Sequence, residues 1–150
     1  ADVTGLIGQY AHGNEPSHHV AYLYNYVDAP WRTQELIPQI LESQYKNIPD
    51  GLIGNDDCGQ MSAWYIFSTL GFYPVNPASQ VFDIGVPAFT RAAIRVGKKQ
   101  FVIKATNLSK DNKYIQSIRL NNKLLEGYQI SYQDIMQGGV LEFFMGNSHK

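Results

Sequence analysis

Cysteine is almost absent from this sequence. The single residue Cys58 excludes a disulfide within the chain of 150 residues. Lysine and arginine form no runs, and the formal net charge of −1 excludes the basic footprint of a nucleic-acid-binding protein. No stretch approaches the roughly 18 apolar residues of a membrane span. The opening ADVTGLIGQYAHG contains neither an initiator Met nor a signal peptide, so we expect a mature or cleaved piece of a protein.

The residues that are present form a globular composition, 44% hydrophobic and 17% charged, whose pattern changes near residue 80. Apolar residues recur at helical spacing before that point and alternate with period two after it. Helices are expected over residues 18–27, 33–46 and 59–70. Strands are expected over residues 81–85, 90–96, 100–107, 113–120 and 138–146, with a hairpin turn at Asn121-Asn122. We therefore predict an α+β fold, with a helical segment over 1–78 and an antiparallel β-sheet or sandwich over 79–150.

Two details of the helices test this interpretation. The first helix is expected to pack through a stripe of apolar side chains at helical spacing, namely Val20, Leu23, Tyr24 and Val27. In the second helix Pro38 is an awkward residue, because proline cannot donate the helical hydrogen bond. That helix is expected either to begin late, near Leu36, or to kink.

Two motifs of the helical half carry most of the residues that could perform chemistry. HGNEPSHH supplies Asn14, Glu15, His18 and His19, and GNDDCGQ supplies Asn55, Asp56, Asp57 and Gln60. Carboxylates, amides and imidazoles exchange hydrogen bonds with hydroxyl groups, and aromatic side chains cover the C–H faces of a sugar ring. This set of side chains indicates a hydroxyl-rich ligand.

The acidic pair has two interpretations. An aspartate before a helix usually caps it, because its carboxylate accepts hydrogen bonds from free backbone N–H groups. One aspartate suffices for a cap, however, and two adjacent carboxylates repel each other, which favours a metal or a polar substrate. The helix dipole keeps such a carboxylate ionised, and an inverting glycosidase needs an ionised carboxylate as its general base.

The other motif residues also have structural alternatives. Glu15 precedes a proline and can be an ordinary exposed turn residue. His18 and His19 are adjacent and point to different sides, so one can be buried while the other faces a pocket. The HExxH pattern is absent, which argues against a zinc site.

Long stretches of the sequence are similar to a known family. Four stretches carry the similarity: GNEPSHHVAYLYNYVDAPW, GNDDCGQMSAWYIFSTLGFYPVNPAS, FDIGVPAF and SIRLNNKLLEGYQISYQDIMQGGVLEFFMG. They resemble the C-terminal part of glycoside hydrolase family 92, and the resemblance covers about residues 5–147. Members are calcium-dependent, inverting exo-α-mannosidases with an N-terminal β-sandwich and an (α/α)6 barrel. The resemblance implies that residues 1–78 are part of that barrel.

The resemblance also implies roles for the motif residues. Asp57 would be the general base, and Asp56 would assist it or position the water. Asn14 and Glu15 would hold Ca2+ or the mannose, and His18 or His19 would orient substrate hydroxyls. Asn55 and Gln60 are further candidates for substrate binding; some members carry an acidic residue at the position of Asn55.

The family implies a substrate and a wider context. The expected ligand is a mannose-containing glycan, often α-1,2-linked, and the expected location is periplasmic or extracellular. The general acid would lie outside this chain, so the chain is expected to be a fragment without turnover that needs the remainder of the enzyme as its partner. The alternatives are a carbohydrate-binding module using tyrosines such as Tyr114, Tyr128 and Tyr132, or an interaction domain.

Overall fold

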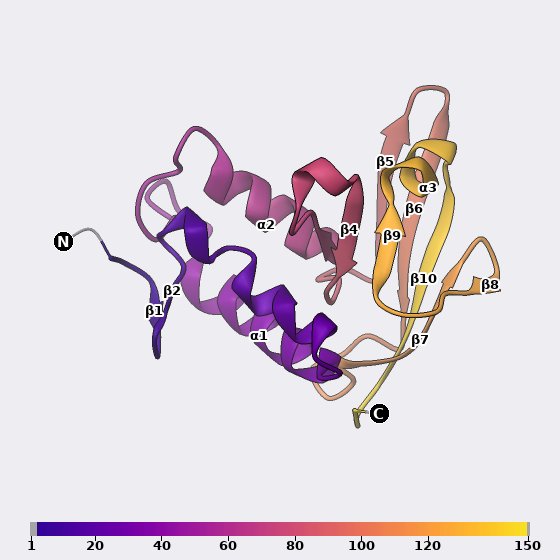
Figure 1. Ribbon diagram of the computed structural model, residues 1–150, viewed down its shortest axis with the longest axis horizontal. Coiled ribbons are helices and arrows are strands. Elements are labelled where there is room, and N and C mark those ends of the chain that lie inside the picture. Colours follow the sequence, from indigo (N-terminus) through magenta and orange to yellow (C-terminus); the bar gives the residue numbers. More distant parts are fainter. Residues whose placement is uncertain (1–2, 150) are drawn as a thin grey trace.

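The computed structural model describes residues 3–149, with the helices of the first half on one side and the main sheet on the other (Figure 1). The helical elements of the first half are η1 Glu15–Ser17, η2 Val20–Tyr26, α1 Pro30–Gln44 and α2 Gln60–Leu70. A short hairpin, β1 Leu6–Ile7 and β2 Tyr10–Ala11, precedes them. No helix in residues 3–149 is long and apolar enough to cross a membrane. Because helical elements dominate the first half and strands the second, the α+β fold class is confirmed.

The first helical element differs from the expectation. The segment η2 is a 3₁₀ helix, and it buries Ala21 and Tyr22. The expected stripe is wrong, because Val20, Leu23 and Val27 are exposed. A 3₁₀ helix has about three residues per turn, so positions chosen at a spacing of 3.6 do not share its buried face.

The two α-helices match the sequence more closely. α1 begins at Pro30, where a missing N–H costs nothing, and it continues past Pro38; the late start is therefore wrong. α2 ends at Gly71, whose φ of 92° is in the left-handed region and whose N–H bonds to the carbonyls of Phe67 and Ser68. This is the closure expected of a glycine at a helix C-terminus.

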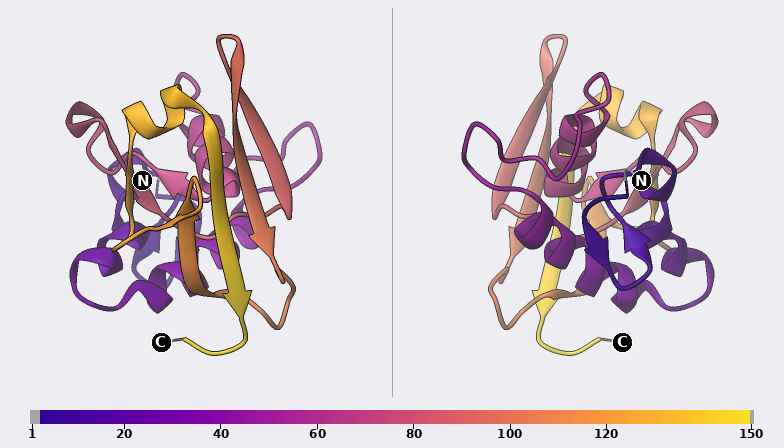
Figure 2. Two further views of the ribbon diagram at one scale, coloured as in Figure 1. Left: turned by 90° about the vertical axis from the view of Figure 1, so that its right-hand side faces the viewer. Right: turned by 90° about the vertical axis from the view of Figure 1, so that its left-hand side faces the viewer.

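The main sheet contains five strands in the order β5-β6-β10-β7-β8. The bounds are β5 Arg91–Val96, β6 Lys99–Thr106, β7 Tyr114–Leu120, β8 Lys123–Leu124 and β10 Gly139–Gly146. β10 lies between β6 and β7 (Figure 2, left) and pairs parallel to β6 and antiparallel to β7. The expected antiparallel pairing is confirmed for β5 with β6, β10 with β7 and β7 with β8. The exception is the parallel pair β6–β10, which arises because β10 inserts between two strands that are neighbours in the sequence.

A second, small sheet joins the two halves. It has the order β3-β4-β9, formed by Phe72–Tyr73, Val81–Ile84 and Gln129–Ser131, and η3 Pro77–Ser79 lies between β3 and β4. Its last strand leads into α3 Tyr132–Gln137, which the sequence analysis missed. The available signal was a capping box, in which the Ser131 hydroxyl accepts from Asp134 N–H and the Asp134 carboxylate accepts from Ser131 N–H. The boundary at 78 stays a prediction.

Two hydrophobic clusters form the interior. The sheet cluster includes five fully buried side chains, those of Phe72, Phe101, Ile103, Leu141 and Phe143. The helical cluster is built from Ala21, Tyr22, Ile37, Ile40, Trp64 and Tyr73. Phe67 of α2 packs against both clusters and so connects them.

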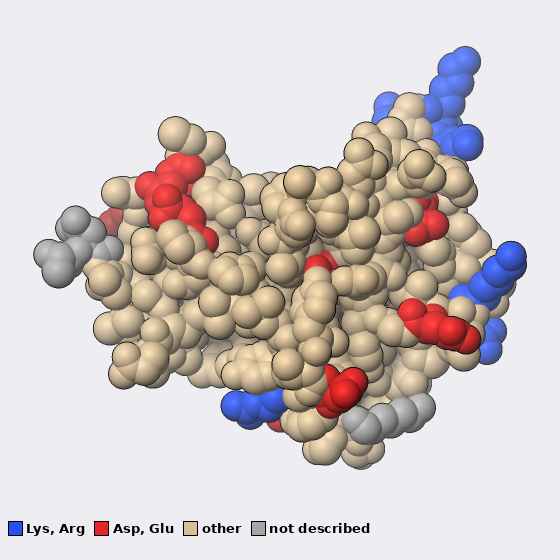
Figure 3. Space-filling view, in the orientation of Figure 1, with Lys and Arg blue, Asp and Glu red and all other residues tan. Residues whose placement is uncertain are grey.

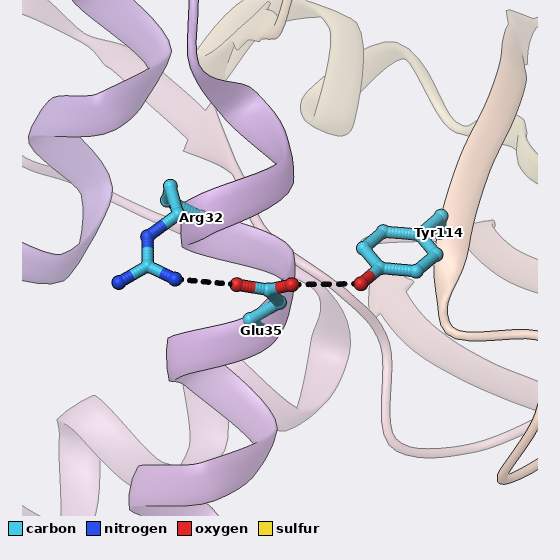
Figure 4. A network of polar contacts seen from close by, with 3 residues as sticks. All are labelled: Arg32, Glu35 and Tyr114. Atoms are coloured by element: carbon cyan, nitrogen blue, oxygen red, sulfur yellow. Dashed lines mark hydrogen bonds and ion pairs between the residues drawn. The ribbon is translucent and has the colours of Figure 1, made fainter. Parts of the chain in front are cut away.

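A polar contact also ties α1 to the main sheet (Figure 4). The Tyr114 hydroxyl donates to Glu35 over 2.7 Å, and Arg32 forms an ion pair with the same carboxylate over 2.8 Å. The Tyr114 hydrogen bond and the nearby arginine lower the pKa of Glu35. Glu35 is therefore an ionised structural residue.

Candidate active site

The two motif turns lie against each other although they are far apart in the sequence. A Cβ atom added at Gly54 would lie 3.7 Å from Cα of Gly13, and one added at Gly13 would lie 2.9 Å from the carbonyl oxygen of Ile53. Gly13 also donates its N–H to the carbonyl of Thr4 over 3.1 Å. The turn that carries Asn14 and Glu15 is thereby placed beside the loop that leads to the acidic pair.

Acidic side chains gather at this end of the molecule. Figure 3 shows them over the loop before α2, whereas lysines and arginines extend from the tip of the β5–β6 hairpin at the opposite end. The charges of Glu15 and Asp57 both act on His18. The structure therefore places both acidic residues within electrostatic range of His18.

Asp56 is used by the helix. Its Oδ1 accepts a hydrogen bond from Ser62 N–H over 2.9 Å, and its carbonyl accepts from Gly59 and Met61 N–H. Ser62 is in the first turn of α2, where N–H groups have no partner within the helix. The capping interpretation of the acidic pair thus applies to Asp56.

Asp57 is placed differently. It has a φ of 47° and is followed by Cys58 at 59° and Gly59 at 97°, so three successive residues are left-handed. For residues other than glycine this conformation costs roughly 1–2 kcal/mol each, and such strain gathers at functional sites. The Asp57 side chain is exposed, and no group among residues 3–149 donates a hydrogen bond to its carboxylate. The turn therefore presents a free carboxylate to solvent.

The remaining predicted residues differ in exposure. Asn14, Glu15 and Asn55 are exposed, His19 is half-buried, and His18 is buried with 1% exposure. His18 uses both ring nitrogens within the protein: Nε2 donates to the His12 carbonyl over 2.9 Å, and Nδ1 accepts from Gln60 Nε2 over 3.1 Å. Burial lowers the pKa of His18, so it is neutral.

Behind the two turns lies a set of aromatic side chains that sequence reasoning missed. The ring of His12, fully buried, receives a hydrogen bond from Tyr10 and pairs with the Tyr45 hydroxyl, each over 2.7 Å. It packs edge-on against Trp64, with ring centroids 4.4 Å apart, and Trp64 Nε1 donates to the His18 carbonyl over 3.0 Å. The one available signal was the i, i+2 spacing of Tyr10 and His12, which places both on one face of an extended segment.

The described residues offer only part of a calcium site. No group of three His, Cys, Asp or Glu residues within 3–149 could hold a metal ion. Ca2+ takes six to eight oxygen ligands, and the Glu15 carboxylate with the Asn14 amide can supply at most about three. A calcium ion at this position would need further oxygens from sugar, water or other protein segments.

Two hollows of the surface lie away from the acidic turns. One of about 850 Å3 is bordered by residues that include Glu35, Leu41, Pro87 and Lys110, and another of about 560 Å3 by residues that include Tyr45, Ile48 and Tyr65. Glu15 and Asp57 line neither of these two hollows, and both residues are exposed to solvent.

The tyrosines of the carbohydrate-binding alternative are mostly used internally. Tyr114 donates its hydroxyl to Glu35, and Tyr128 packs against the sheet cluster. Tyr132 is the exposed one of the three, at 47%. The polar motifs remain the more complete candidate site.

Comparison with known proteins places this geometry in context. Residues 1–147 match the model of the glycosyl hydrolase family 92 catalytic domain. The structure is similar to that of a family GH92 α-mannosidase of Bacteroides thetaiotaomicron in complex with mannoimidazole, with a TM-score of 0.93 and 45% identity over 99% of this chain and 20% of that one. It is also similar to a family GH92 inverting mannosidase of the same species, with a TM-score of 0.87 and 37% identity over 95% of this chain and 19% of the other.

A curated relative agrees with these matches. A protein of Arthroderma benhamiae described as a secreted glycosidase is 31% identical over 138 residues, which cover 89% of this chain and 18% of that protein. The chain thus spans about one fifth of the length of the relatives that it matches. The resemblance seen in the sequence is confirmed: this chain belongs to glycosyl hydrolase family 92.

Proposed function

We propose that this chain is the C-terminal portion of an inverting α-mannosidase and supplies the general base of that enzyme. The observation that carries the proposal is the exposed Asp57 carboxylate, presented by a left-handed turn beside Glu15 and His18. Identity of 45% to one α-mannosidase and 37% to an inverting mannosidase supports it. In this proposal the helices of residues 1–78 are part of an (α/α)6 barrel.

The reaction assigns one proton to this chain. Asp57 accepts a proton from a water molecule as the water oxygen bonds to the anomeric carbon of the mannosyl group. The bond from that carbon to the leaving oxygen breaks, and the leaving oxygen takes the electron pair and a proton from a general acid located outside this chain. Attack on the face opposite the leaving group inverts the configuration, so β-mannose is released.

The neighbouring residues prepare this step. Asp56 fixes the turn through Ser62 N–H and so positions Asp57 and its water. The exposed side chains Asn14, Glu15 and Asn55 and the half-buried His19 face hydroxyl groups of the sugar. Because Asn55 is an amide, it binds a hydroxyl without competing for the proton.

Calcium is part of the proposal. Asn14 and Glu15 would contribute oxygen ligands, and the bound ion would coordinate sugar hydroxyls and favour the distorted ring of the transition state. Dialysis of the full-length protein against a chelator should abolish turnover, and added Ca2+ should restore it. Full activity after chelation would remove calcium from the reaction.

The substrate and location follow from the family. The proposed substrate is a terminal α-1,2-linked mannose of a glycan such as an N-glycan, and the proposed location is periplasmic or extracellular, supported by a relative described as secreted. The exposure of Glu15 and Asp57, and the one fifth of its relatives' length that the chain spans, support the proposal that other segments of a longer protein complete the site. The 150-residue chain alone should then show no turnover on an α-mannoside that the full-length protein hydrolyses.

Product configuration tests the central proposal. In proton NMR of the full-length protein acting on an aryl α-mannoside, β-mannose should be the first sugar to accumulate. Asp57→Asn should lower kcat by about 10²–10⁴, the usual contribution of a general base. Asp50→Asn, which changes an exposed aspartate of the preceding loop, is the matched control and should retain wild-type kcat. Initial release of α-mannose, or an active Asp57→Asn variant, would refute the assignment.

A further inference from the structure

His18 has a fixed tautomer. Its Nε2 lies 2.9 Å from the carbonyl oxygen of His12, which can only accept, so Nε2 must carry the hydrogen. Its Nδ1 lies 3.1 Å from Gln60 Nε2, an amide nitrogen that can only donate, so Nδ1 must be unprotonated. A protonated His18 would place two donors face to face at the second contact.

Gln60 joins His18 to the turn of Asp57. It is the first residue of α2, and its backbone N–H donates to the Asp57 carbonyl over 3.2 Å. Its side-chain amide also donates to the Tyr73 hydroxyl over 3.2 Å. His18 in turn follows Glu15 closely in the sequence and caps the short helix η1 that contains it. The contact between His18 and Gln60 is therefore a direct side-chain link between the two acidic turns.

The surroundings keep His18 in place. Trp64 Nε1 holds the His18 carbonyl, and the ring centroid of His12 lies 4.9 Å from that of His18. The titratable groups that act on His18 are Glu15 and Asp57, whose charges favour its protonation; burial opposes protonation more strongly. His12 is itself neutral, because burial and the neighbouring His18 lower its pKa to about 3.

We propose that neutral His18 and Gln60 form a clamp that positions the Asp57 turn against the Glu15 turn, so that both are positioning residues and neither binds the sugar. This inference rests on the proposed function, since Asp57 is the base whose position matters. It replaces the substrate-binding role that the family resemblance implies for these two residues. The chain of contacts runs from the Glu15 carbonyl to His18 N–H, from His18 Nδ1 to the Gln60 amide, and from Gln60 N–H to the Asp57 carbonyl.

Two substitutions, one on each side of the contact, test the clamp in the full-length protein. Gln60→Met keeps the length of the side chain and removes the donor, so kcat on an α-mannoside should fall at least about tenfold while KM stays within about twofold. His18→Leu removes the acceptor and should lower kcat in the same way, and the double variant should be little worse than either single variant.

A stability measurement separates this proposal from the proposed function. His18→Leu and Gln60→Met should each lower the Tm, and the double variant should lower it by less than the two losses added together, because both changes break the same contact. This readout holds even if the protein releases no mannose, which would refute the function alone.

Three results would overturn the clamp. Both variants could raise KM with unchanged kcat, which would place Gln60 against the sugar. Both could retain wild-type kcat at all pH values, which would make the link dispensable. The Tm losses of His18→Leu and Gln60→Met could add fully in the double variant, which would show that the two side chains do not depend on each other.

Discussion

The two halves of the molecule are held together by different chemistry. The sheet half encloses an apolar cluster of residues such as Phe101, Ile103 and Phe143, which need no partners beyond close packing. The helical half buries Trp64 and Tyr22 together with His12 and His18, and their polar atoms are joined by hydrogen bonds. Polar groups are costly to bury unless each finds its partner. The helical interior therefore specifies geometry, and it lies directly behind the turns that carry the acidic residues.

Charge divides the molecule in the same way. Residues 1–78 contain two of the twelve Lys and Arg residues and eight of the thirteen Asp and Glu residues. The lysines and arginines are thus concentrated in the sheet half, as Figure 3 shows at the end opposite to the acidic turns. The half proposed to perform the chemistry is the acidic one, and the other half serves as its support.

A substitution that creates a cavity in the sheet half should have the largest effect, and it tests whether the two halves have separate roles. Phe143 of β10 is fully buried, so Phe143→Ala should lower the free energy of opening of the sheet by about 3–5 kcal/mol. Hydrogen exchange of the β6, β7 and β10 amides measures this loss. Turnover per folded molecule should stay at the wild-type level, because Phe143 packs within the sheet cluster whereas Asp57 belongs to the turn before α2. Lys104→Ala, an exposed change on β6, serves as control, and a parallel loss of turnover in Phe143→Ala would break the division.

Acid should weaken the helical half first. Burial lowers the pKa of His12 from its ordinary value to about 3, so the unfolded state binds a proton below about pH 6.5 that the folded state refuses. The free energy of opening should therefore fall by up to about 1.4 kcal/mol for each pH unit between 6.5 and 3 from this residue. Exchange of the α1 and α2 amides, compared with that of the β6 and β10 amides, gives the measurement. Equal pH dependence in both halves would contradict the comparison.

A matched pair of substitutions at Asp56 should have an intermediate effect. Asp56→Ala removes the acceptor for Ser62 N–H and should cost about 1 kcal/mol of local stability, with a fall in kcat as the Asp57 turn loosens. Asp56→Asn keeps an acceptor oxygen and should recover most of both. Thermal unfolding and kcat on an α-mannoside check the pair. An Asn variant as impaired as the Ala variant would show that the charge of Asp56 acts directly.

The smallest effect is expected at Asp83, the buried acid of β4. Burial raises the pKa of Asp83, so folding favours its protonated form and stability is lost as the pH rises through that pKa. Asp83→Asn should therefore raise the free energy of unfolding at pH 7 by less than about 1 kcal/mol and should change little at pH 3. Urea unfolding at the two pH values tests the sign. Destabilisation at pH 7 would show that the bonds from Tyr26 and Gln129 outweigh the cost of burial.

Local rules predicted those elements that local chemistry controls. The helix expected over 59–70 is α2 Gln60–Leu70, and Asn121 and Asn122 adopt φ values of 51° and 68° in the expected hairpin turn. The proximity of Glu15 and Asp57 was predicted from the family resemblance rather than from spacing. Nothing in the residues themselves links two turns so distant along the chain.

The failures share a physical cause, which is long-range packing. The stripe of η2 failed because the segment winds as a 3₁₀ helix, and its buried residue Tyr22 pairs with Ser68 of α2. The parallel pairing of β10 with β6 was not predicted, because strand order depends on which neighbours bury the most surface. The role of His12 was missed because a histidine shows its partners only once the fold brings Tyr45 beside it.

The position of β10 has a consequence for synthesis of the protein. This strand is in the interior of the main sheet, yet it follows every other strand of that sheet in the sequence. Until residues 139–146 have been synthesised, β6 and β7 each have an unpaired edge, a template for association with a second nascent chain. Synthesis of β10 therefore sets the earliest moment at which the sheet can close.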